Sequence, residues 1–311
     1  MKTLPCFVLT VAMLSTSVSA VTTARRTLAV PDGTLSYRMA GSGRPILLLT
    51  GGPGHSGDYL DPVFEHLAAT RMTILLDQRG TGLSVLQQAD SSTITLAKSI
   101  DDLERLRIAL GIQQWALFGH SWGGMLAMAY TAAYPDRVSE LILVGSGGAS
   151  LVSHTRIGAA LDRRLTPTER DTIRSMERSA PNNAEPETAL ALKKLRWSAY
   201  LYDRGSLAAV TTRLTPRTYN AKVSHMMLSN LERTHYDLRE RLKIDAAAGR
   251  LPHAVLLVYG EADAWGLGTA AEITAAFPRI VVRVIPRSGH FPWIESPVAF
   301  YRAVDAFVVG H

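Results

Sequence analysis

Short apolar segments alternate with helical patterns along much of this chain, and this alternation constrains the fold more than any other feature. The segments are PILLLT (45–50), MTILLD (72–77), WALFG (115–119) and VSELILVG (138–145). Stretches with apolar residues three and four apart, such as TITLAKSIDDLERLRIAL, separate them. Strands that are apolar on both faces are typical of a parallel sheet covered by helices on both sides. We therefore expect an α/β fold with a mostly parallel sheet.

The alternation stops after the fourth apolar segment and resumes about a hundred residues later. The intervening residues are charged and helical in pattern, and several prolines interrupt them. Strand-like segments return as AVLLVYG (254–260) and IVVRVIP (280–286), and PVAFYRAVDAFVV has the pattern of a closing helix. At the other end, TLAVPDGTLSYRMA predicts a β-hairpin. The predicted organisation is a core formed by residues 21–149 and 251–311, with a helical insertion at 150–250.

The first twenty residues have the pattern of a secretory signal peptide. Lys2 supplies a positive charge, LPCFVLTVAML is a short apolar segment, and small residues precede Ala20. The apolar segment is shorter than the roughly 20 residues that span a bilayer. We expect residues 1–20 to be cleaved after Ala20 and the mature protein to be secreted or periplasmic, without stable membrane insertion. Cys6 is the single cysteine, so the mature chain would have no disulfide.

Composition and motifs argue against several classes of function. The net charge is +6, but the basic residues are dispersed, so nucleic acid is not an expected partner. The His-Glu-x-x-His pattern of zinc hydrolases is absent, and the glycine-rich loop TGGPG (50–54) lacks the Gly-Lys-Ser/Thr ending of phosphate-binding loops. We expect no cofactor and no metal, and a small molecule or short peptide as substrate. The sequence indicates no particular oligomeric state.

The segment ALFGHSWGGMLAMAY (116–130) surrounds Ser121 with glycines where an apolar strand gives way to a helical pattern. Glycines at 119 and 123 lack the Cβ atoms that would obstruct a very tight turn, as in the nucleophile elbow Gly-x-Ser-x-Gly. The N-terminus of the following helix favours developing negative charge. These features predict Ser121 as a nucleophile, and the alternative is a tight turn without chemistry.

A serine nucleophile requires a base, and the base requires an acid that orients it. In an α/β fold of this kind the chain order is serine, acid, histidine. His290, in RSGHFPW, is the one histidine that follows Ser121 and comes directly after the last strand-like segment. The segment VYGEADAWG supplies the acid, and we predict Asp263, with Glu261 as the alternative.

Two backbone N–H groups should stabilise the negative charge that develops on the substrate carbonyl. Trp122 follows the predicted nucleophile and supplies one of them. The glycine-rich loop supplies the other, and Gly52 is the expected donor because Pro53 has no N–H.

Several of these segments together resemble a known family. GGPG (51–54), DQRGTGLS (77–84), GHSWGG (119–124), GEAD (260–263) and SGH (288–290) are similar to the α/β-hydrolase family that includes proline iminopeptidases. The resemblance implies an α/β-hydrolase fold whose helical insertion forms a cap, and a triad of Ser121, Asp263 and His290. It also implies release of an N-terminal residue, often proline, from a short peptide.

The chain departs from that family at positions that bear on substrate choice. Thr50 replaces a usual histidine, and Tyr200 and Leu201 stand where the cap commonly has Trp and Glu. The remaining cap acids that could hold a substrate amine are Glu232 and Asp203. We expect a serine aminopeptidase. The alternatives are a carboxylesterase or other small-molecule acyl hydrolase with the same triad, and a non-enzymatic ligand-binding protein on this scaffold.

Overall fold

The computed structural model describes residues 24–179, 185–252, 254–277 and 279–310. The predicted signal peptide, residues 1–20, lies outside the described residues. The strands are β1 (Arg25–Val30), β2 (Gly33–Ala40), β3 (Pro45–Leu49), β4 (Met72–Asp77), β5 (Val85–Leu86), β6 (Trp115–His120), β7 (Val138–Val144), β8 (Ala254–Gly260) and β9 (Ile280–Ile285).

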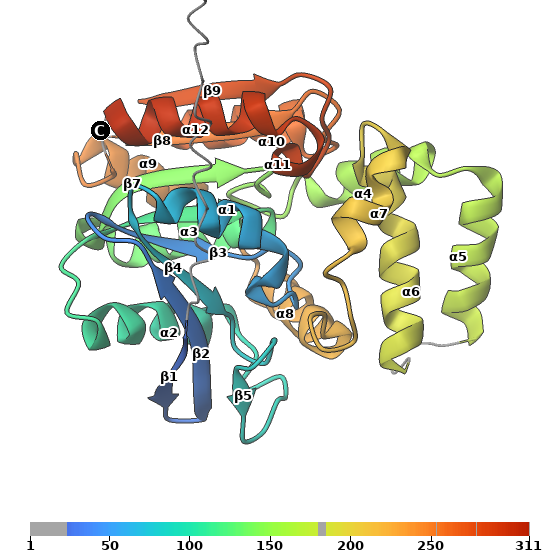
Figure 1. Cartoon of the computed structure of the whole chain (residues 1–311), viewed down its shortest axis with the longest axis horizontal. Coiled ribbons are helices and arrows are strands. Elements are labelled where there is room, and N and C mark those ends of the chain that lie inside the picture. The colour runs from blue at the N-terminus through green and yellow to red at the C-terminus, as the bar shows by residue number, and fades with distance from the viewer. Residues whose placement is uncertain (1–23, 180–184, 253, 278, 311) are drawn as a thin grey trace, which may run out of the picture.

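Helices lie on both faces of one sheet, and others lie beyond its edge (Figure 1). They are α1 (Asp61–Ala68), α2 (Leu96–Ala109), α3 (Trp122–Ala133), α4 (His154–Arg164), α5 (Pro167–Ser179), α6 (Pro186–Trp197), α7 (Leu207–Thr211), α8 (Ala221–Arg233), α9 (Arg239–Ala247), α10 (Gly266–Ala276), α11 (Pro292–Glu295) and α12 (Pro297–Gly310), with short 3-10 turns η1 (Gly57–Leu60), η2 (Pro135–Arg137), η3 (Ser198–Tyr200) and η4 (Arg204–Ser206).

The strands form one mixed sheet in the order β1-β2-β4-β3-β6-β7-β8-β9, with β5 beside β2. Strands β3, β4 and β6 to β9 run parallel. The predicted hairpin, β1 and β2, joins them antiparallel through β4. The prediction of a mostly parallel sheet is therefore confirmed. Because parallel strands end at the same edge, the loops after β3, β6, β7, β8 and β9 gather at one side of the sheet.

Both faces of the sheet are buried, as the continuous apolar strands predict. In β3, Leu47 and Leu49 belong to one hydrophobic cluster, which includes residues of α2, α3 and α10. Ile46 and Leu48 point the other way, into a second cluster with residues of α1 and α12. All four side chains are fully buried, and burial of each stabilises the fold by about 1.5–3 kcal/mol. The expectation of helices on both faces is confirmed.

The helical insertion lies between β7 and β8. Helices α4 to α7 project beyond the edge of the sheet as a cap (Figure 1). The end of the insertion differs from the expected cap, because α9 packs against α3 and α10. Tyr236 and Leu242 are buried in the same cluster as α3. Because these two side chains are buried there, the last part of the insertion belongs to the core and not to the projecting cap.

Of the helices in the described part of the chain, none combines the length and the apolar character needed to cross a bilayer.

Candidate active site

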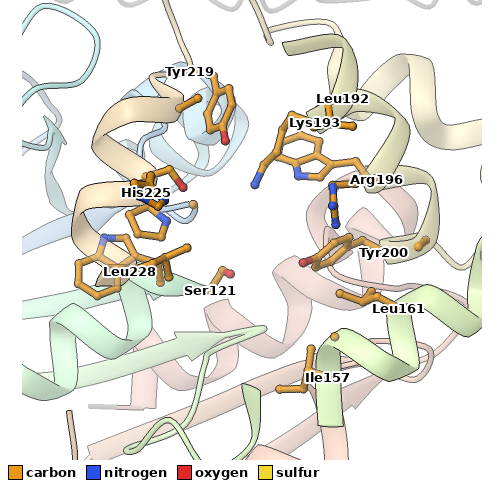
Figure 2. Close-up of a pocket in the computed structure, with 18 of the residues that line it drawn as sticks. Ser121, Ile157, Leu161, Leu192, Lys193, Arg196, Tyr200, Tyr219, His225 and Leu228 are labelled. Carbon is orange, nitrogen blue, oxygen red and sulfur yellow. The ribbon is translucent and has the colours of Figure 1, made fainter. Parts of the chain in front are cut away.

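Ser121 lies at the turn from β6 into α3, in a backbone conformation with φ 55° and ψ −117°. A positive φ is uncommon for a residue with a side chain, and such strained conformations cost about 1–3 kcal/mol. Two hydrogen bonds hold the turn: the Ser121 N–H donates to Val144 O, and the Gly124 N–H donates to Ser121 O, each at 3.0 Å. The conformation directs the hydroxyl away from the sheet and toward the cap (Figure 2).

Gly123 explains why the turn can be so tight. A Cβ atom at this position would overlap the backbone carbonyl group of Leu49, at the end of β3. The helix α3 therefore approaches β3 more closely than any larger residue would permit. This close packing places Ser121 at the sheet edge where the other loops gather.

Asp263 and His290 form a hydrogen-bonded pair at the same edge. His290 Nδ1 lies 3.0 Å from Asp263 Oδ2 and 3.1 Å from Oδ1, and both residues are buried. Asp263 Oδ1 also accepts the Trp265 N–H at 3.0 Å, which fixes the carboxylate. Glu261 is exposed, and its backbone N–H donates to Ile285 O. Of the two acids that the sequence left open, Asp263 is the one that contacts His290.

The end of β7 brings Ser121 and this pair together. The Ser121 N–H is bonded to Val144, and the next residue, Gly145, packs against Asp263 and His290 closely enough that a Cβ atom would lie 2.9 Å from each side chain. The Ser121 hydroxyl forms no hydrogen bond within the part of the chain that the structure describes. Catalytic hydrogen bonds are often loose until substrate binds, so this geometry is compatible with a resting triad.

The two predicted oxyanion donors line the same cavity as Ser121. Gly52 and Trp122 both face it, and the buried side chain of Gln78 connects them. Gln78 Nε2 donates to Thr50 O, and Gln78 Oε1 accepts the Trp122 indole N–H, both at 2.9 Å. Gln78 thus holds the glycine-rich loop against the elbow. Sequence reasoning assigned no role to Gln78, although it belongs to the DQRGTGLS segment.

His120, beside the predicted nucleophile, contacts two of the loops at this edge of the sheet. Its ring lies 2.8 Å from the Tyr59 hydroxyl through Nδ1 and 2.9 Å from His290 O through Nε2. Tyr59 in turn accepts the Gly51 N–H. Burial lowers the pKa of His120 well below its ordinary value, so the ring stays neutral at pH 7. These contacts join the glycine-rich loop to the loop that carries His290.

The cap is attached to the loops of the acid and the base. Arg164, at the end of α4, donates to the carbonyl oxygens of both Ala262 and Leu201. The His290 N–H donates to Tyr200 O at 2.9 Å, and the rings of these two residues lie 4.9 Å apart. The position of the cap and the position of the base are therefore coupled.

A cavity of about 660 Å³ separates Ser121 from the cap. Figure 2 shows it between α8 on one side and α4 and α6 on the other, with Ser121 at its floor. Most of its lining is apolar or aromatic. Its charged lining residues are Asp162, Glu177, Lys193, Arg196 and Lys222. Among the described residues, no group of three or more His, Cys, Asp or Glu could hold a metal ion.

The two cap acids predicted to hold a substrate amine do not line this cavity. Asp203 is exposed, and its carboxylate accepts the Gly205 N–H at 2.9 Å as the cap of η4. Glu232 is an exposed residue of α8. A sequence motif does not determine whether a cap residue faces the cavity or the solvent. The structure therefore does not bring Asp203 or Glu232 to Ser121.

These observations define the class of protein. The chain belongs to the alpha/beta hydrolase fold family, whose family model matches residues 44–297.

Several relatives are named proline iminopeptidase, among them proteins of Xylella fastidiosa and Xanthomonas citri. The protein of Xylella fastidiosa is 39% identical over 113 residues, which is 36% of this chain and 36% of the relative. In this and similar matches the chain spans about a third of the relative's length. That of Xanthomonas citri is 28% identical over 298 residues, covering 88% of this chain and 93% of the relative. The crystal structure of a proline iminopeptidase of Mycobacterium smegmatis is similar with a TM-score of 0.67 and 21% identity, covering 93% of this chain and 98% of that one. This last likeness concerns the fold alone.

Proposed function

We propose that the protein is a serine hydrolase that cleaves a small ester or amide by acyl transfer to Ser121. The observation that supports the proposal is the hydrogen-bonded pair of His290 and Asp263, buried beside an elbow whose serine lines the cavity under the cap. A non-enzymatic binding protein would have no need of this pair or of the strained backbone at Ser121.

In the proposed mechanism, His290 Nε2 takes the proton of the Ser121 hydroxyl as its oxygen attacks the substrate carbonyl. Asp263 accepts the Nδ1–H, which fixes the tautomer and stabilises the imidazolium. The N–H groups of Gly52 and Trp122 bind the oxyanion, and each such donor contributes about 2.7–4 kcal/mol to the transition state. His290 then protonates the leaving group, and water releases the acyl group by the same steps.

The charges of the cavity support a substrate without a cationic group. A peptide N-terminus is a cation at neutral pH, and a cavity that encloses it requires a carboxylate partner. Of the two lining carboxylates, Glu177 already pairs with Arg196, and Asp162 is exposed. Lys193 and Lys222 line the same cavity and would repel an ammonium group. The proposal is therefore an esterase or related acyl hydrolase.

The second candidate is an aminopeptidase that releases an N-terminal residue such as proline. The names of the relatives favour it. Under this candidate Asp162 would have to bind the amine, because Glu232 and Asp203 do not line the cavity.

Parallel assays of 4-nitrophenyl butyrate and proline 4-nitroanilide test the choice. The proposal predicts turnover of the ester with a kcat/KM at least tenfold above that of the anilide, and loss of both activities in Ser121→Ala. Preference for the anilide, lost in Asp162→Asn, would establish the aminopeptidase instead. If the protein cleaves neither substrate and no longer ester, the result would contradict the proposal that it is a serine hydrolase.

We also propose that the protein is exported, on the basis of the leader pattern alone. Expression in a bacterial host, followed by N-terminal sequencing of the periplasmic and secreted fractions, should give Val21 as the first residue. An intact Met1 in a protein confined to the cytoplasm would contradict export.

A further inference from the structure

The side chain of Lys193 lines the cavity that contains Ser121. It belongs to α6, is half-buried, and extends from the cap into the space above Ser121 (Figure 2). Its ammonium group lies 5.2 Å from the centre of the Tyr219 ring, on the opposite wall. Among the residues that the structure describes, no carboxylate forms an ion pair with it. The positive charge is therefore held by an aromatic ring and remains available to a ligand.

A partly buried cation without a carboxylate is uncommon, because lysines are mostly exposed and a charge removed from water needs compensation. A cation–π contact with tyrosine compensates only in part. The charge of Lys193 also affects the pKa of a buried histidine. Buried His55 has its pKa lowered well below the ordinary value by burial first and then by the charge of Lys193. Lys193 therefore places a positive charge at this part of the cavity wall.

Of the other charged lining residues, two neutralise each other, one adds to the charge of Lys193 and one opposes it. Arg196, three residues further along α6, forms an ion pair with Glu177, so these two largely neutralise each other. Lys222, on α8, is exposed at the other wall. Against Lys193 and Lys222 stands Asp162 on α4, the single remaining carboxylate among the described lining residues. The cavity thus offers an anion two cations and one opposing charge.

We propose that Lys193 binds an anionic group of the substrate, so that the natural substrate is an ester or amide that also carries a carboxylate. This inference rests on the proposed serine hydrolase function and adds the substrate class. The carboxylate stays intact: the ester and one water give an acid and an alcohol, while Lys193 holds the anion and Ser121 performs the acyl transfer. The apolar residues of the cavity contact the chain between the two groups.

Two matched pairs of aryl esters test the proposal with probes of known charge. On the acyl side, mono-4-nitrophenyl adipate is compared with 4-nitrophenyl 6-methylheptanoate, in which two methyl groups replace the carboxylate oxygens. On the alcohol side, 4-acetoxybenzoate is compared with its methyl ester. In at least one pair the parent protein should prefer the anionic ester by about 10- to 100-fold in kcat/KM, which is the range of a hydrogen bond to a charged group.

Variants of one helix identify the residue responsible. Lys193→Gln should reduce that preference at least tenfold, and Lys193→Arg should keep most of it. Lys194→Gln is the matched control, because it removes the same charge from the next residue of α6, which does not line the cavity. Its preference should equal that of the parent, and raised salt should weaken the preference only modestly because the site is partly enclosed.

The outcomes separate this inference from the proposed function. Hydrolysis of the esters with no preference for either anionic partner would overturn the role of Lys193 and leave the serine hydrolase standing. A preference that survives in Lys193→Gln, or is lost equally in Lys194→Gln, would overturn it as well. If the parent cleaves none of the four esters, the proposed function fails and this inference fails with it.

Discussion

The His290 N–H donates a hydrogen bond to the Tyr200 carbonyl oxygen at 2.9 Å, so the cap holds the proposed base directly. The two residues are 90 positions apart in sequence, and their rings lie 4.9 Å from each other. The neighbouring Glu295 accepts the Gly289 N–H at 2.7 Å and the Tyr202 N–H at 2.8 Å. These two hydrogen bonds form a second link between the loop of His290 and the cap. The base is therefore oriented from two sides, by Asp263 and by the cap.

Gly289 allows the cap to lie this close to the loop of His290, and the substitution Gly289→Ala tests whether this contact matters for catalysis. A Cβ atom here would overlap the Tyr200 carbonyl oxygen, so the substitution should push the cap away from the base. A displacement of about 1 Å at a catalytic group can cost on the order of 100-fold in rate, and we expect kcat for an ester to fall at least tenfold. Gly268→Ala is the control, because Gly268 in α10 has open space around its Cβ position. Equal kcat in both variants would contradict the coupling.

Asp263 and Glu261 give a second prediction. Asp263→Asn removes the carboxylate that accepts the His290 Nδ1–H, so kcat should fall by about 10⁴, as for other triads in which Asp is replaced by Asn. Glu261→Gln alters an exposed side chain and should leave kcat within twofold. Steady-state kinetics on one ester checks both. A large loss in Glu261→Gln with little loss in Asp263→Asn would move the acid by two residues.

The predictable part of this protein is the part in which local sequence and sheet geometry agree. Apolar strands predicted the parallel sheet, and the elbow and the loops after β8 and β9 predicted which residues meet, because parallel strands end at one edge. Gln78 and His120 act through buried hydrogen bonds between distant segments, and no local pattern encodes such partners. In the cap, the solvent-facing positions of Glu232 and Asp203 depend on tertiary packing. The inward position of Lys193 depends on it equally.

His55 makes stability depend on pH. Its ring is buried among Tyr59, Trp197 and Tyr219, and neither ring nitrogen has a hydrogen-bond partner among the described residues. Burial, and then the charge of Lys193, lowers its pKa well below 6.5 in the folded protein. The unfolded chain, with a histidine pKa of about 6.5, therefore binds a proton that the folded protein does not.

Stability should consequently fall as the pH drops below about 6.5, by up to roughly 1.4 kcal/mol per pH unit for this one group. His55→Phe removes the group while keeping an aromatic ring. Relative to the parent, the free energy of unfolding of the variant should rise by about 1.4 kcal/mol between pH 7.5 and pH 5.5. Urea titrations at the two pH values measure it. A difference that does not change with pH would show that folding does not lower the pKa of His55.

The role of Ser121 as the nucleophile can be measured directly by locating the covalent adduct formed with diisopropyl fluorophosphate. This reagent phosphorylates a serine that a neighbouring base activates, and peptide mapping by mass spectrometry identifies the modified residue. We expect one adduct per chain, on Ser121, with loss of ester hydrolysis in proportion to labelling and no adduct in Ser121→Ala. An adduct on a different serine, or full hydrolytic activity in Ser121→Ala, would contradict this role of Ser121.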